Sequence, residues 1–408
     1  MALNDIDTIG TIPAPYGYIS HLSSPEMHYL QYHVEQGSKL LANLETDQNP
    51  LRAMIIPRAL SSPLLMEAVC AVSARHLANR SHDSLTTGTA AANYYIRTLR
   101  GLRTALAVHP TSAFRVDTML AVAFLCKYEV VRGSVKQWAV HLDALQKLVV
   151  SRGGFACIDQ EAAEFLWGLL MYAHNVAMIT KRSQFSAVTS APNNIRLTKL
   201  DIYVGYTEEL IKTCARIADI PFLDADCVAV GLEVHAIDES LKSHSHTRST
   251  SQYIIPKGTT QATLARLQMV ADCFHDAAYI YLHSTLERMA HAQQPPPPPQ
   301  AAAAWSSLTS VSKPDALRFC LSRIRAFSPL DGHCEYSALT FPLFIAGCAA
   351  VDHGEREIVV SALGALEANF GIGNVQRVRE LLGVLWEGPG MEHWLDVLEE
   401  LQWDLILA

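Results

Sequence analysis

Histidines are the first residues of this chain to consider for acid–base chemistry or metal binding. The sequence contains 17 of them; His76 and His141 fall on apolar faces of predicted helices, and His333 stands beside Cys334. An isolated histidine on a packed face is usually hydrogen-bonded to a nearby carbonyl. Residue types alone also supply no catalytic geometry. We therefore assign none of these histidines a catalytic or ligand role.

Paired aspartates are the second candidate. Helical enzymes of the terpene-cyclase kind hold magnesium and diphosphate with aspartate-rich clusters, and Asp224-Ala-Asp226 is the nearest approach to one here. Two carboxylates just after Pro221 are typical of a surface turn. His-Glu-x-x-His, Gly-x-Ser-x-Gly, Walker and Gly-x-Gly-x-x-Gly motifs do not occur in the sequence. We predict no catalytic, cofactor-binding, metal-binding or DNA-binding residue, and no cofactor.

The cysteines indicate a reducing compartment. There are nine, never closer than 13 residues and mostly inside apolar runs. This spacing argues against a disulfide framework and against a Cys-x-x-Cys zinc site. The first thirty residues lack the pattern of a secretory signal, and no uninterrupted apolar stretch reaches membrane length. We expect an intracellular protein without contact to a membrane.

The charge argues against DNA binding by this chain alone. The formal net charge is −8, and the basic residues are scattered or paired, as in Lys181-Arg182. Surfaces that bind the phosphate backbone of DNA usually contain clustered lysine and arginine residues.

The stretch from Leu339 to Val351 should form the centre of the fold. After Thr340 it offers almost no polar side chain, and Pro342 is acceptable in a first helical turn. A helix that is apolar all round must be surrounded by other helices, and 13 residues cannot span a bilayer. Gly347 among small residues would let neighbouring backbones approach closely.

Apolar residues recur at helical spacing along most of the chain, and we find no run long enough for a sheet. The sequence therefore predicts an all-α fold, a large helical array around a buried central helix. We expect helices near residues 27–44, 63–76, 89–106, 117–131, 138–149, 161–179, 206–217, 227–241, 261–291, 315–325, 339–351, 356–370, 375–386 and 391–405.

Turn-rich and polar stretches divide the chain. We expect a flexible tail over residues 1–24 and one helical domain over 25–408. Exposed loops are predicted near 183–200 and 242–258, and a proline-rich linker over 293–304.

Several blocks of sequence resemble a known family. They begin with Asn49–Arg52 and Leu60–Leu77, and continue with Trp138–Leu145, Leu339–Gly347, Asn374–Trp386 and Trp394–Leu398. In order and spacing they resemble the fungal-specific transcription factor domain, the helical regulatory region that follows the zinc binuclear cluster in many fungal activators and repressors. The resemblance runs from about residue 26 to the C-terminus.

The sequence departs from that family at its beginning. A group of six cysteines that holds two zinc ions, and the basic linker behind it, have no counterpart here. Three hypotheses stay open. The chain works through a DNA-binding partner, or it has lost its DNA-binding domain and has another function, or an upstream part lies outside this sequence.

The resemblance implies a transcriptional regulator or co-regulator that acts through protein contacts in the nucleus, with the cytoplasm as the alternative location. Its expected partners are a zinc-cluster transcription factor or the transcription machinery, with a small-molecule effector between helices and no direct contact to nucleic acid. An alternative from another class is an accessory enzyme of a fungal biosynthetic pathway that uses an apolar pocket. A third reading is an inert dimerisation partner that titrates a full-length factor.

Overall fold

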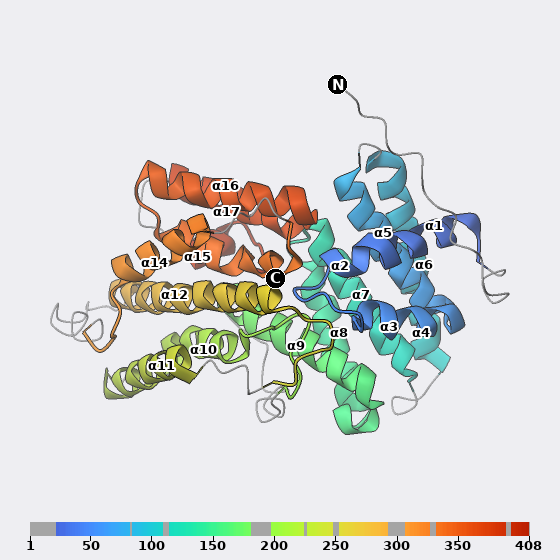
Figure 1. The fold of residues 1–408 in the computed structure, drawn as a ribbon, viewed down its shortest axis with the longest axis horizontal. Coiled ribbons are helices and arrows are strands. Elements are labelled where there is room, and N and C mark those ends of the chain that lie inside the picture. Colours follow the sequence, from blue (N-terminus) through green and yellow to red (C-terminus); the bar gives the residue numbers. More distant parts are fainter. Residues whose placement is uncertain are drawn as a thin grey trace.

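The computed structural model describes residues 22–81, 84–108, 114–180, 197–223, 227–247, 253–292, 307–326, 332–388 and 393–407. The fold is all-α, as predicted (Figure 1). Over these described ranges there is no β-strand; an isolated parallel bridge joins Lys199 to Ile254. None of the described helices is long and apolar enough to cross a membrane.

The N-terminal part packs around two inner helices, α5 and α7. Both are buried along most of their length, and α5 contacts α6 and α7 extensively. Figure 1 shows this part on the right, in blue and green. Its helices are α1 (Ser24–Tyr32), a π-helical turn (His33–Gly37), α2 (Ser38–Leu40), α3 (Pro50–Ala53), α4 (Ile55–Ser61), α5 (Pro63–Arg80), α6 (Ser84–Val108), α7 (Val116–Arg132), α8 (Gln137–Ser151) and α9 (Gln160–Thr180).

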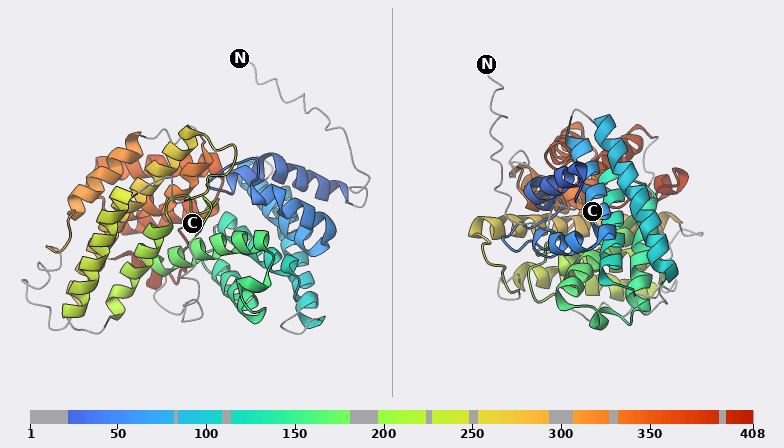
Figure 2. Two further views of the ribbon diagram at one scale, coloured as in Figure 1. Left: turned by 60° about the horizontal axis from the view of Figure 1, so that its bottom comes forward. Right: turned by 90° about the vertical axis from the view of Figure 1, so that its right-hand side faces the viewer.

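The C-terminal part packs around α15. Figure 2 shows the long helix α12 running beside α10 and α14, with the later helices behind it. The helices are α10 (Glu208–Asp219), α11 (Cys227–Thr247), α12 (Gln261–Ala292), α14 (Lys313–Ala326), a 3₁₀-helix (Cys334–Leu339), α15 (Thr340–Ala349), α16 (His353–Phe370), α17 (Gly373–Glu387) and α18 (Trp394–Glu400).

Helix α15 is the predicted buried central helix. Its side chains from Phe341 to Ala346 are inaccessible to solvent, and it contacts α12, α14, α16 and α17. A Cβ atom on Gly347 would lie 2.7 Å from Leu382 of α17 and 3.2 Å from Val359 of α16. The missing side chain therefore allows three helices to meet, as the sequence indicated.

A close backbone contact joins the two parts. Gly133 ends α7 in the left-handed region with φ of 76°, which glycine adopts without steric cost. A Cβ atom there would lie 2.6 Å from the carbonyl oxygen of Gly373, the first residue of α17. The last turn of α7 is thereby held against the link between α16 and α17.

The apolar side of α6 is only partly buried. Ile96, Leu99 and Leu106 recur on it at helical spacing, yet they are 44%, 38% and 40% exposed. The buried face contains Tyr94, Thr98 and Leu102. Arg97, which is half exposed, forms an ion pair with Glu67 of α5.

The chain beyond α18 is not helical, contrary to the prediction of a helix to Leu405. Helix α18 ends at Glu400, and Leu405, Ile406 and Leu407 have no regular secondary structure and are buried. Their backbone is held by distant groups: Asp404 N donates to Val135 O at 2.7 Å, and Asn374 Nδ2 donates to Ile406 O at 3.2 Å. Tertiary hydrogen bonds replace the helical ones.

The predicted loop at 242–258 is also corrected in its first part. Helix α11 continues to Thr247, because Leu241 is buried and Lys242 pairs with Asp238 one turn earlier. The predicted exposed loop at 183–200 is corrected at its last residue, because Leu200 is only 3% exposed. The helix predicted over residues 27–44 ends at Leu40, with α2.

Several of the predicted segments lie outside the described residues. These are the tail over 1–21, the Asp224–Asp226 pair, the loop segments 183–196 and 248–252, and the proline-rich linker at 293–304.

Candidate functional site

A partly open cavity of about 70 Å³ lies where α7, α9 and the C-terminal segment meet. We call it the α7–α9 cavity. Most of its lining is aliphatic, and its polar groups come from segments far apart in the sequence. It is lined by Leu40, Leu41, Asn43, Cys126, Lys127, Val130, Val131, Leu169, Tyr172, Ala173, Tyr203, Ser337, Ile372 and Ile406.

Lys127 of α7 places a cation in this apolar lining. Its Nζ donates to the carbonyl oxygen of Leu41 at 2.8 Å and lies 4.5 Å from the ring centre of Tyr203. It forms no ion pair with a carboxylate of the described residues. Burial therefore lowers its pKa to about 8, with only the Cys126 thiol acting in the other direction. Two of the three N–H groups of the ammonium have no acceptor in the described chain.

Two tyrosines of the lining are left without a hydrogen bond. Tyr172 of α9 and Tyr203 are each only 5% exposed, and neither hydroxyl finds a partner in the described chain. Burial raises the pKa of both phenols well above the usual value, so both are donors at neutral pH. A buried hydroxyl without a partner is unfavourable by about 1–3 kcal/mol. The cavity thus combines an unpaired cation with two unused donors.

The other polar side chains of the lining are committed to the protein. Asn43 Nδ2 donates to Tyr203 O at 2.6 Å, and Ser337 Oγ donates to Asn43 Oδ1 at 2.6 Å. The thiol of Cys126 donates to Trp138 O at 3.7 Å, and burial raises its pKa to about 12. These groups fix the walls and are unsuited to acid–base or nucleophilic chemistry.

The buried C-terminal segment closes one wall of the cavity. Trp138 of α8 donates its indole N–H to Asp404 O, and the Thr180 hydroxyl at the end of α9 donates to Leu405 O. These bonds place Ile406 against the lining. The cavity is therefore bounded by both parts of the fold.

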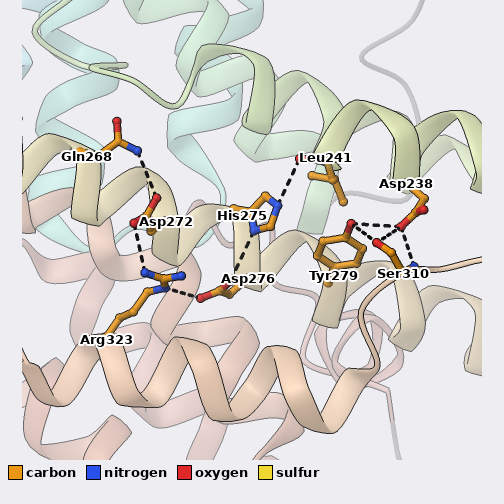
Figure 3. Close-up of polar contacts among 9 residues, drawn as sticks. All are labelled: Asp238, Leu241, Gln268, Asp272, His275, Asp276, Tyr279, Ser310 and Arg323. Carbon is orange, nitrogen blue, oxygen red and sulfur yellow. Dashed lines mark hydrogen bonds and ion pairs between the residues drawn. The ribbon is translucent and has the colours of Figure 1, made fainter. Parts of the chain in front are cut away.

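A second cluster of polar residues follows α12, and Figure 3 shows it as a chain of contacts. We call it the α12 network: Asp238, Gln268, Asp272, His275, Asp276, Tyr279, Ser310 and Arg323. Arg323 of α14 bridges Asp272 at 3.1 Å and Asp276 at 2.8 Å, both on α12. His275 reaches the carbonyl oxygen of Leu241 on α11 at 3.3 Å. The network ties α11 and α14 to α12.

Asp238 is the most buried acid of the α12 network. Its Oδ1 accepts from Tyr279 at 3.0 Å and from the backbone and hydroxyl of Ser310 at 2.8 Å each. Its Oδ2 pairs with Lys242 at 2.7 Å. Burial raises the pKa of Asp238, but these donors outweigh it and the pKa is lowered overall. Each charge here has a partner, which is typical of a structural network.

The histidines singled out from the sequence lie elsewhere. His76 contacts the Tyr32 hydroxyl at 3.0 Å through Nδ1 and Phe370 O at 2.6 Å through Nε2, and burial lowers its pKa to about 4. His141 contacts the Tyr95 hydroxyl at 2.9 Å, and burial lowers its pKa to about 4 as well. Both are neutral, hydrogen-bonded packing residues near pH 7.

His333 and Cys334 do not form a nucleophile and base. The two residues begin the 3₁₀-helix before α15, where the His333 ring packs against Tyr336. Burial raises the pKa of Cys334 to about 12, so its thiol stays protonated. Within the described residues, no three His, Cys, Asp or Glu side chains are grouped so that they could hold a metal ion.

Sequence reasoning missed the residues of the α7–α9 cavity. One signal was present: Lys127 and Glu129 are the charged residues inside the otherwise apolar run between Asp117 and Arg132. A lysine within a predicted inner helix indicates either a buried cation or a local exit to solvent. Nothing local marked Tyr172 or Tyr203.

Comparison with known proteins identifies the family. The model of the fungal specific transcription factor domain matches residues 28–408, nearly the whole chain. No curated protein and no solved structure matches the sequence. The match covers both parts of the fold, including every segment that lines the α7–α9 cavity. This chain belongs to the family of fungal-specific transcription factor domains.

Proposed function

We propose that this chain regulates transcription by contacting other proteins in the nucleus, namely a zinc-cluster transcription factor or the transcription machinery. The observation that carries this proposal is the family match over residues 28–408, which supports a regulatory role in transcription. The net charge of −8 supports contacts to proteins rather than to a phosphate backbone.

The surface of α6 supports a role in protein contacts. Ile96, Leu99 and Leu106 lie three and seven residues apart, so they share one side of the helix, and each is more than a third exposed. Partly exposed aliphatic residues on a long surface helix are suited to helix–helix contact.

The α7–α9 cavity supports the further proposal of a small-molecule effector. It lies between the two parts of the fold and contains polar groups that the protein itself leaves unused. A ligand that binds there better in one arrangement of the two parts would shift their equilibrium.

A reporter assay tests the proposed function. The chain is fused to an unrelated DNA-binding module and directed to a promoter, with the module alone as the control. We expect output to change at least severalfold in either direction. Output equal to that of the module alone would contradict the proposal. Co-purification of a zinc-cluster protein without any change in output would support the inert dimerisation partner instead.

An accessory enzyme is the alternative function, since the cavity is mostly apolar and is lined by several segments. Its lining contains no histidine, aspartate or glutamate from the described chain, and its thiol is protonated and hydrogen-bonded. Lys127 and the two tyrosines are the groups of the lining that could transfer a proton. If deletion of the gene for this chain abolishes one product of a biosynthetic pathway and leaves messenger levels unchanged, the result would favour the enzyme over the regulator.

A further inference from the structure

We propose that the α7–α9 cavity binds a small aliphatic monocarboxylate, whose carboxylate contacts the ammonium of Lys127 and the hydroxyls of Tyr172 and Tyr203. That this binding regulates transcription rests on the function proposed above. The binding itself rests on the cavity alone.

The charge of the ligand follows from Lys127. A partly buried ammonium without a carboxylate partner is unfavourable, and the Leu41 carbonyl and the Tyr203 ring compensate it only in part. A single negative charge on the ligand would complete the pair. A dianion would leave one charge uncompensated, because no second basic residue lines the cavity within the described chain.

The donors select a carboxylate among the anions. A carboxylate accepts at about four lone-pair sites on two oxygens. The residues of the lining include Lys127, with two ammonium N–H groups uncommitted in the described chain, and Tyr172 and Tyr203, whose hydroxyls have no partner there. Hydrogen bonds to an ionised acceptor are about twice as strong as neutral ones. Both hydroxyls are buried, so a ligand oxygen would replace no existing protein contact.

The remainder of the ligand must be short and apolar. A cavity needs about 10–15 Å³ to hold one water, so about 70 Å³ accommodates several atoms. The aliphatic walls are formed by Leu40, Val130, Leu169, Ile372 and Ile406 among others. They favour a chain of a few carbons over a hydroxylated one.

The position of the site explains how such a ligand would act. Lys127 belongs to α7 and Tyr172 to α9, whereas Ser337, Ile372 and Ile406 come from the C-terminal part. A carboxylate held there contacts both parts at once and disfavours arrangements in which they separate.

Titration calorimetry of the full chain tests the inference, with butyrate as the probe and butyramide and butylamine as neutral and cationic analogues of similar size. We expect saturable binding of butyrate and no measurable binding of the analogues. Lys127→Met should abolish the binding, and Tyr172→Phe and Tyr203→Phe should each weaken it about tenfold, the effect of losing a hydrogen bond to a charged group. Lys147→Met, at an exposed lysine of α8, is the matched control and should bind as the unchanged chain does.

The outcomes separate the inference from the proposed function. Absence of butyrate binding at millimolar concentration, equal binding by Lys127→Met, or equal binding of butyramide would each overturn the inference, the first indicating a cavity filled with water only. A reporter response without butyrate binding leaves the regulatory function standing and overturns the ligand. If butyrate binds but the fused chain leaves the reporter output unchanged, the ligand stands and the regulatory function is overturned.

Discussion

The α7–α9 cavity and the α12 network are both buried collections of polar groups, and they differ in how far those groups are satisfied. Asp238 has a partner at each oxygen, whereas Lys127 has no acid and two nearby tyrosine hydroxyls have no partner in the described chain. A satisfied buried network stabilises a fold, while unused buried groups are unfavourable. The difference indicates structure in one region and ligand binding in the other.

The largest expected effect is at the centre of the α12 network. Asp238→Ala removes the acceptor of four contacts, which leaves the backbone N–H of Ser310 without its acceptor and the Tyr279 and Ser310 hydroxyls bonded only to each other. We expect the free energy of unfolding to fall by about 2–4 kcal/mol, measured by urea denaturation. Asp143→Ala, which breaks an exposed pair with Lys147, is the control and should change it by less than about 0.5 kcal/mol. Equal effects would show that the network is not structural.

In the α7–α9 cavity, removal of a polar group is expected to raise the free energy of unfolding. The folded chain lowers the pKa of Lys127 from 10.5 to about 8, so between these values it binds fewer protons than the unfolded chain. Stability attributable to this group therefore rises with pH from about 8 to 10.5, and its destabilisation is complete below pH 8. Lys127→Met should raise the free energy of unfolding at pH 7 by up to about 3 kcal/mol. The gain should vanish near pH 10.5; a loss of stability at pH 7 would contradict the account.

A matched pair of tyrosines sharpens the comparison. Tyr279→Phe removes a hydroxyl that joins Asp238 and Ser310, and we expect a loss of about 1–2 kcal/mol. Tyr172→Phe removes a hydroxyl without a described partner, so the stability should stay within about 0.5 kcal/mol or rise. Thermal denaturation of the two variants side by side measures the difference. Similar losses in both would mean that Tyr172 is also satisfied.

The fold could be predicted from the sequence where packing is local. The apolar run around Phe341 required a buried helix, and Gly347 marks the point where neighbouring helices approach. The failures are tertiary in origin. Helix α6 exposes Ile96 while Tyr94 packs against Tyr29 of α1, and Leu405 leaves the helical pattern because Thr180 and Asn374 hold its backbone and that of Ile406. No window of local sequence contains those partners.

The cavity could not be predicted for the same reason. Its polar groups stand at positions 127, 172 and 203, on segments whose approach depends on the whole fold. Lys127 by itself is compatible with a side chain that leaves an inner helix for solvent. Only the position of its ammonium over the Tyr203 ring, with no acid paired to it in the described chain, shows that the charge is unpaired.

The most direct test of the central claim is the titration of Lys127 itself, followed by NMR in chain labelled at lysine, with Lys127→Met to assign the signal. The account predicts a pKa of about 8 in the free chain and a clear increase when butyrate is added, because a carboxylate partner favours the charged ammonium. A pKa near 10.5 that does not respond to butyrate would contradict it.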